Sequence, residues 1–274
     1  MLSKTGLAIC AFASALIVAV TPIYAQATKT TINAATTPAF APLEYKDPTS
    51  GKVIGFDIDL FEVVAKKMGA KVNWVETDWQ QLTNSIKTKR ADVVVAGMSD
   101  TPQLRETLSF VHYLNNGASF VTLRSNATQI PDTNALCGKR IANMRNSLTA
   151  RALTQWSDNN CTKAGKPAVT VLETQGTADS RLQLNQNRAD AAVQLTVQMG
   201  YQNTIEENRY IVLGEPFFNA AFGIAFSKDD PQFGETIKNA LAAVIADGTY
   251  QELLRKWSLP DNLAIKQPMI NGQP

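Results

Sequence analysis

Apolar positions in the first part of the chain follow two alternating spacings, and the changes of spacing predict strands and helices in turn. The expected order is a strand at 30–36, a helix from Phe56 to Met68, a strand at 71–76, a helix at 79–87 and a strand at 91–96. In the first helix, Leu60, Phe61 and Val64 recur at helical spacing and would form one buried face. Strands that alternate with helices are typical of a mainly parallel α/β sheet.

A further strand is predicted at 119–123, and the same alternation starts again after a polar stretch at 124–138. Strands are predicted at 139–142, 168–172, 191–195, 210–213 and 222–226, with helices at 149–156, 178–186 and 231–245. Asp230 is expected to cap the last of these helices, with Pro231 at its first position. Two α/β units of about 100 residues each, joined by two crossings of the chain, predict a clamshell. Such a clamshell closes on a small ligand by rotation of one lobe against the other.

The stretch 91–105 is the most informative part of the first unit. An apolar run ends at Gly97, and Ser99 and Thr101 follow just before Pro102. Thr101 is expected to cap a helix that begins at Pro102. A strand-to-helix edge of this kind offers backbone N–H groups and hydroxyls to an anionic group of a ligand. An ordinary connection without a ligand is the alternative.

The N-terminus has the pattern of a secretory signal peptide. Lys4 precedes an apolar run at 7–20, and small residues follow at a cleavage position after Ala25 or Ala27. An uncleaved anchor is the alternative, although the apolar run is short for a membrane span. We therefore expect a signal peptide at 1–27 and a periplasmic protein.

Charge and cysteine content narrow the possible functions. A formal net charge of +2 gives no basic surface for nucleic acid. Cys137 and Cys161 are expected to form a disulfide in an exported chain, which would contribute roughly 3 kcal/mol; two buried thiols are the alternative. Because His112 is the only histidine, no metal site is expected. No cofactor is expected either.

Six motifs, in this order, resemble those of the bacterial extracellular solute-binding proteins that serve polar amino-acid ABC importers. They are the segments at 40–45, 55–60, 78–79, 91–99, 223–225 and 246–250. The arrangement of Cys137 and Cys161 also resembles one branch of that family. The resemblance covers the chain after the signal peptide and implies two lobes joined by two hinge strands. Lobe 1 would be residues 28–121 plus 222–274, and lobe 2 would be residues 124–218.

The resemblance also implies positions for the ligand site. Phe40 matches the family's aromatic stacking position, and Trp79 matches a second wall position. Gly97 and Ser99 match the edge that binds the ligand carboxylate, and Ser147 lies in the corresponding turn of lobe 2. Because family members close on a solute and then dock on a membrane permease, we expect a small-molecule ligand, a permease partner and a monomer.

Two charged positions of the family pattern carry leucine in this chain. Leu104 stands where an arginine binds the ligand carboxylate, and Leu195 stands where an aspartate binds the ligand ammonium. An ammonium buried without a counter-charge costs several kcal/mol. We therefore expect a less polar organic acid or an amino-acid derivative with a masked amine. Arg105, one residue late, and Arg145 are the candidate cations for an anionic group, and a solvated arginine is the alternative for Arg145.

Three functions fit these features. A binding protein for ABC import needs no catalytic group and is the main interpretation. The resemblance also extends to exported cyclohexadienyl dehydratases, for which Glu44 or Glu173 could act as acid or base, although neither belongs to a catalytic constellation. A ligand-sensing domain is the third, weakened because no output segment follows Pro260.

Overall fold

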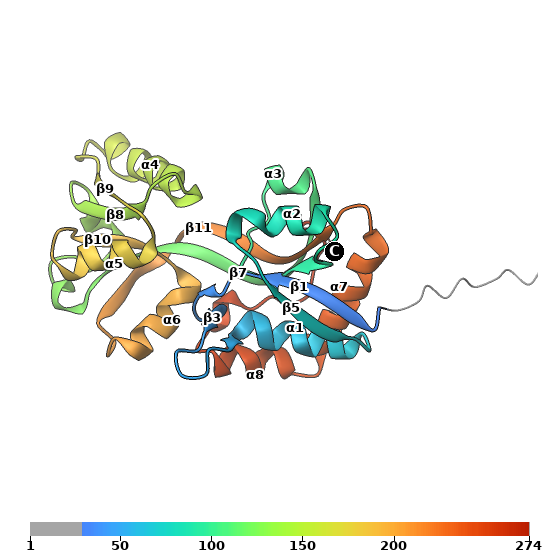
Figure 1. Ribbon diagram of the computed structural model, residues 1–274. Coiled ribbons are helices and arrows are strands. Elements are labelled where there is room, and N and C mark those ends of the chain that lie inside the picture. The colour runs from blue at the N-terminus through green and yellow to red at the C-terminus, as the bar shows by residue number, and fades with distance from the viewer. Residues whose placement is uncertain (1–28, 274) are drawn as a thin grey trace, which may run out of the picture.

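The computed structural model describes residues 29–273, and the expected signal peptide at 1–27 lies outside the described residues. Two α/β halves are joined by two long strands in Figure 1. One eight-stranded sheet runs through both halves, in the order β5-β1-β6-β11-β7-β10-β8-β9. Its strands are β1 (Thr31–Thr36), β5 (Lys71–Glu76), β6 (Val93–Val94), β7 (Leu108–Leu123), β8 (Arg140–Met144), β9 (Thr170–Thr174), β10 (Ala191–Leu195) and β11 (Tyr210–Ser227).

The first half contains the parallel strands β5, β1 and β6, packed between helices. Its helices are α1 (Phe56–Lys67), α2 (Leu82–Lys87), α3 (Pro102–Arg105), α7 (Pro231–Ala246) and α8 (Thr249–Lys256). A small antiparallel sheet adds β2 (Ala39–Phe40), β3 (Glu44–Lys46) and β4 (Val53–Ile54). Asp230 caps α7 by accepting a hydrogen bond from the amide of Phe233, with Pro231 at the first helical position, as the sequence predicts.

The second half contains the parallel strands β10, β8 and β9. Its helices are α4 (Leu148–Asn160), α5 (Thr177–Asn185) and α6 (Thr196–Ile205). The disulfide between Cys137 and Cys161 ties the end of α4 to the segment before β8. The predicted α/β architecture with two halves, each built on parallel strands flanked by helices, is therefore confirmed, although the strands of both halves belong to one mixed sheet rather than to two.

The two connecting strands are longer than the sequence analysis predicted. β7 and β11 pair antiparallel from Leu108 opposite Ser227 to Leu123 opposite Tyr210, with an irregularity between Leu213 and Phe218. The predicted strands at 119–123, 210–213 and 222–226 are only their ends. The polar middle residues, such as Asn115 and Asn116, break the apolar pattern but still form strand because each strand pairs with the other.

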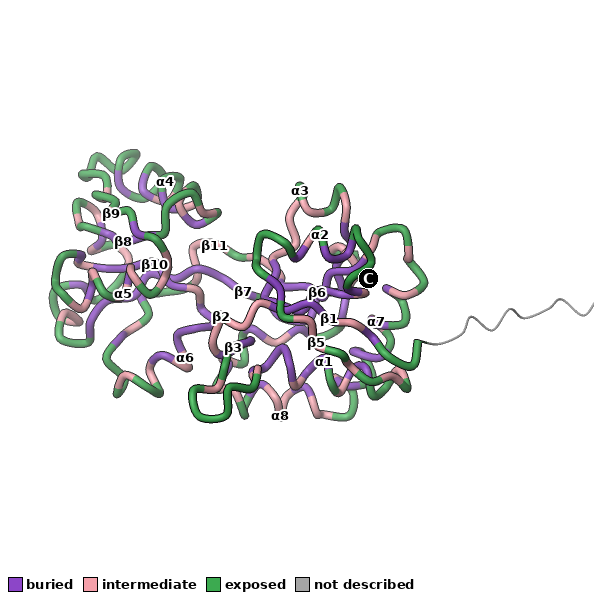
Figure 2. The backbone as a smooth tube through the Cα atoms, in the orientation of Figure 1, coloured by how far each residue is buried: buried purple, intermediate pink, exposed green. Residues whose placement is uncertain are grey.

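Each half has an interior of its own, shown in purple in Figure 2. In the first half, Phe56, Phe61 and Tyr250 belong to the largest cluster of buried side chains. In the second half, Phe120 and Leu153 belong to a separate cluster. Helix α6, which the sequence analysis missed, follows β10 of the second half, yet its Val197 is buried in the first cluster. It therefore connects the two interiors.

Within residues 29–273, no helix combines the length and the apolar character needed to cross a bilayer. The same residues contain no group of three His, Cys, Asp or Glu side chains placed to hold a metal ion.

Candidate functional site

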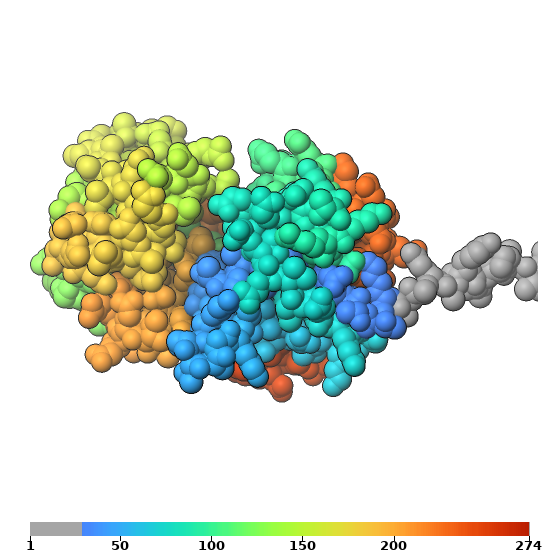
Figure 3. All heavy atoms as spheres, in the orientation of Figure 1, coloured from blue at the N-terminus to red at the C-terminus, as the bar shows by residue number. Residues whose placement is uncertain are grey.

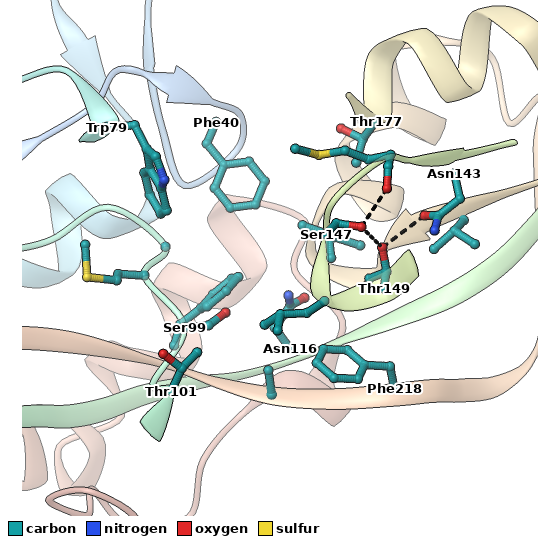
Figure 4. Close-up of a pocket in the computed structure, with 18 of the residues that line it drawn as sticks. Phe40, Trp79, Ser99, Thr101, Asn116, Asn143, Ser147, Thr149, Thr177 and Phe218 are labelled. Carbon is teal, nitrogen blue, oxygen red and sulfur yellow. Dashed lines mark hydrogen bonds between the residues drawn. The ribbon is translucent and has the colours of Figure 1, made fainter. Parts of the chain in front are cut away.

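A cavity of about 320 Å³ lies between the two halves. Figure 3 shows the groove at the boundary of the halves, and Figure 4 shows the cavity walls. Side chains of both halves and of the connecting strands line it, so a molecule inside would contact both halves at once. The size lies at the lower end of the range for small-molecule sites.

Aromatic side chains form the wall on the first half. Phe40, at the end of β2, meets Phe222 of β11 edge to face, with ring centroids 6.1 Å apart. Trp79 begins a short 3₁₀ helix (Trp79–Gln81) and is 50% exposed, as a ligand platform in an open cavity would be. Gly97 lies against the Phe40 ring, because a Cβ atom there would be only 2.7 Å from the ring carbon Cε1. Its φ of +53° also favours glycine.

The edge at 97–101 has the geometry that the sequence predicts. Thr101 caps α3 by accepting a hydrogen bond from the amide of Leu104, at 3.3 Å. The amide of Asp100 donates to the Ala221 carbonyl, and the amide of Gly223 donates to the Met98 carbonyl. These two bonds flank Ser99, so its own amide and hydroxyl take no part in the pairing with β11. The edge therefore presents Ser99 to the cavity (Figure 4).

Two fully buried acidic side chains, Asp57 and Glu44, lie in the interior next to this edge. Asp57, the second residue of α1, accepts hydrogen bonds from the amide of Gly97 at 2.9 Å and from the Tyr113 hydroxyl at 2.7 Å. Burial raises the pKa of Asp57 to about 6. Burial, together with the Asp57 charge, raises the pKa of Glu44 well above its usual value. The hydrogen bond from the Gly97 amide to Asp57 holds the backbone of this edge in place.

The wall on the second half is built from hydrogen-bonded polar side chains. The Thr149 hydroxyl donates to Asn143 Oδ1 at 2.9 Å, and the Ser147 and Thr149 hydroxyls are 2.8 Å apart. Ser147 also caps α4 by accepting a hydrogen bond from the amide of Ala150 at 3.1 Å. Asn143 Nδ2 is buried and has no hydrogen-bond partner among the described residues. The hydroxyls are thus engaged within this half, whereas one amide donor is unused.

Within the described part of the chain, no side chain that lines the cavity carries a charge. The polar ones are Ser99, Thr101, Asn116, Asn143, Ser147, Thr149 and Thr177. The others are Phe40, Trp79, Gly97, Met98, Leu104, Met144, Leu148, Val193, Leu195, Phe218, Ala220 and Phe222. Six of the eight ligand-binding candidates from the sequence analysis are among them: Phe40, Trp79, Gly97, Ser99, Ser147 and Leu195.

The structure places the two candidate arginines outside the lining. Arg105 forms a two-point ion pair with Asp100, at 2.5 and 2.6 Å, and His112 Nε2 lies 2.6 Å from the same carboxylate. Burial acts to raise the pKa of Asp100, but the hydrogen bonds from His112 and Arg105 outweigh it and lower that pKa. Arg145 donates to Gln175 Oε1 at 2.9 Å. Both guanidinium groups are therefore engaged elsewhere.

The carboxylates considered for a dehydratase are also absent from the lining. Glu44 is buried beneath Gly97, and Glu173 borders a separate surface depression. The sequence analysis, in turn, missed Asn116, Asn143 and Phe218. Asn116 and Phe218 lie in the middle of β7 and β11, which the apolar pattern did not reveal, and a lone asparagine near a strand end carries no signal of its own.

Comparison with known proteins assigns this architecture to a family. The model of the bacterial extracellular solute-binding proteins, family 3, matches residues 32–260. The chain belongs to this family. The predicted resemblance is thus confirmed, and the protein is a solute-binding protein of the amino-acid ABC importer type rather than an enzyme.

Relatives of this solute-binding protein are named as amino-acid binders. The arginine-binding protein of Corynebacterium glutamicum is 29% identical over 255 residues, which cover 91% of this chain and 81% of that protein. The histidine-binding periplasmic protein of Escherichia coli K12 is 28% identical, with 82% of this chain and 86% of that protein covered. A solved structure of an ancestral cationic amino acid solute-binding protein matches with a TM-score of 0.69 at 26% identity, covering 84% of this chain and 96% of that one.

Proposed function

We propose that this solute-binding protein captures a small molecule in the periplasm and delivers it to the membrane permease of an ABC importer. The cavity between the two halves carries the proposal, because walls from both halves would let a bound molecule stabilise a closed form. The relatives named as periplasmic binding proteins support the compartment. We further propose that the protein acts as a monomer after removal of a signal peptide at 1–27.

The proposed lobes are residues 28–121 plus 222–274 and residues 124–218. The long antiparallel pairing of β7 with β11 supports this division, because both strands pass between the halves and could bend as a hinge pair. The irregularity between Leu213 and Phe218 gives β11 a point at which its pairing is already interrupted. We propose that Phe40, Trp79, Gly97, Ser99, Ser147 and Leu195 contact the bound solute.

The test is a thermal-shift screen of small molecules against the wild-type protein and two tryptophan variants. Ala220 of β11 lines the cavity, so Ala220→Trp fills it. Val212, on the same strand but 42% exposed and outside the lining, gives the control Val212→Trp. A molecule that binds between the lobes raises the melting temperature of the wild type and of Val212→Trp, but not of Ala220→Trp. A shift that persists in Ala220→Trp would contradict the proposed site.

A further inference from the structure

Among residues 29–273, none of the side chains that line the cavity can pair with either charge of an amino acid. Leu104 of α3 and Leu195 at the end of β10 face the cavity from opposite halves, and neither can pair with a carboxylate or an ammonium. We infer that the cavity selects uncharged small molecules with an apolar body and a carbonyl or hydroxyl group. This inference rests on the proposed function and specifies the ligand class for the same site.

The cations closest in sequence to the lining residues are already paired with other groups. Arg105 directs both of its hydrogen bonds to Asp100, which also binds His112, and the Asp100 side chain is only 2% exposed. The Asp100 carboxylate therefore already balances the charge of Arg105. Arg145 lies between the lining residues Met144 and Ser147 in the sequence, but it does not line the cavity and donates a hydrogen bond to Gln175. Neither of these two guanidinium groups thus faces the cavity as a binding site for an anion.

Three acidic side chains at or behind the 97–101 edge, Glu44, Asp57 and Asp100, do not line the cavity and are not placed to bind an ammonium there. Glu44 and Asp57 are fully buried, and Asp57 already accepts hydrogen bonds from the Gly97 amide and the Tyr113 hydroxyl. Asp100 is engaged by Arg105 and His112. A ligand amine that entered the cavity would exchange water for aromatic faces and neutral hydroxyls. Burial of a charge without a counter-ion is strongly unfavourable, whereas a neutral polar group needs only one hydrogen bond.

The lining instead offers neutral hydrogen bonds around an apolar centre. Ser99 supplies a hydroxyl and an amide on one side, and Asn143 on the other side has a buried Nδ2 donor without an acceptor. Both can bind a carbonyl or hydroxyl oxygen. Phe40 and Trp79 offer aromatic faces to an aliphatic body between these polar groups (Figure 4). Shape and hydrogen bonding, rather than charge, thus determine which molecule fits.

Three leucine compounds test the inference. L-leucine is a zwitterion, N-acetyl-L-leucine is an anion, and N-acetyl-L-leucinamide is neutral. The two acetylated compounds differ only in carboxylate against carboxamide, so their comparison isolates the charge, whereas L-leucine also lacks the acetyl group. Isothermal titration calorimetry with the wild-type protein at pH 7 should show the neutral probe binding at least roughly 100-fold more tightly than L-leucine. L-arginine and L-histidine are added because relatives are named for them, and neither should bind measurably.

The outcomes separate the inference from the proposed function. Preferential binding of the neutral probe, abolished by Ala220→Trp and retained by Val212→Trp, supports both. Equal or tighter binding of L-leucine, L-arginine or L-histidine that Ala220→Trp abolishes overturns the inference and leaves the proposed site intact. Binding that is retained in the Ala220→Trp variant contradicts the proposed location of the ligand site. If the neutral probe shows no binding at concentrations up to about 10 mM, which corresponds to a very weak affinity, the inference is also overturned.

Discussion

Replacement of the two cavity leucines by charged residues should give the protein affinity for ordinary amino acids. In Leu104→Arg/Leu195→Asp, each new side chain begins at a position that already lines the cavity, from opposite halves. Leu195 is also the residue that immediately precedes α6 as its N-cap, where aspartate is among the preferred residues. The positive end of the helix dipole would help to keep that new aspartate ionised.

The expected gain follows from the two charge-assisted contacts. A hydrogen bond to a charged group contributes about 1.5–3 kcal/mol, so two of them give about 3–6 kcal/mol. Part of this is offset by desolvation of the new charges in the unliganded cavity. We therefore expect an increase of at least about 100-fold in affinity for L-leucine, which corresponds to about 2.8 kcal/mol. The neutral probe should bind less tightly than to the wild type, because the charges must lose water to admit it.

Calorimetric titration of the double variant and of a neutral control, Leu104→Met/Leu195→Asn, measures this gain. The control changes the same two positions without charge and should leave L-leucine unbound. Leu104 packs against the core cluster that contains Phe110, so the melting temperature of each variant is measured first to show that it folds. An unchanged L-leucine affinity in the folded double variant would refute the idea that these leucines exclude zwitterions.

Three further predictions concern the site wall, the buried acids and the disulfide. Phe40→Ala should weaken binding of the neutral probe about 10-fold in calorimetry, because the ring forms one cavity wall; unchanged affinity would remove Phe40 from the ligand site. Burial raises the pKa of Asp57 from 3.8 to about 6, so the folded state binds a proton on Asp57 more tightly than the unfolded chain does. The stability that this proton contributes is fully present below pH 4 and is lost as the pH rises through 6. The unfolding free energy of the wild type minus that of Asp57→Asn should thus fall by about 3 kcal/mol between pH 4 and pH 7 in urea titrations, and a flat or rising difference would contradict the assignment. Loss of the disulfide in Cys137→Ala/Cys161→Ala should lower the unfolding free energy by about 3 kcal/mol relative to the oxidised wild type. Under reducing conditions the wild type loses the same bond, so the difference should largely vanish, and a difference that persists there would contradict this assignment.

Most of the fold could be predicted because its elements have strong local patterns. The strand at 71–76 was predicted with its observed bounds, and the caps at Thr101 and Asp230 form as expected. The middle of β7 and β11 could not be predicted, because Asn115, Asn116 and the residues opposite them are held in strand conformation by each other rather than by local preference. Helix α6 was missed for a related reason, since its apolar residues pack against both halves and lack a simple stripe.

Residues of the candidate site could be predicted where they belong to a sequence motif. Lining residues outside a motif, such as Asn116, Asn143 and Phe218, could not. Phe40, Trp79, Gly97 and Ser99 were found through motif and turn chemistry, and all of them line the cavity. The ion pair of Arg105 with Asp100 could not be predicted from the sequence. Its engagement depends on Asp100 and His112, and His112 belongs to a strand whose position the pattern did not reveal.

The most direct measurement is the identification, by mass spectrometry, of the small molecule that co-purifies with the native protein expressed in a bacterial periplasm. The account predicts a molecule without formal charge at pH 7, absent from a parallel preparation of Ala220→Trp. Recovery of arginine, histidine or another zwitterionic amino acid from the wild type, and its loss from Ala220→Trp, would contradict the account.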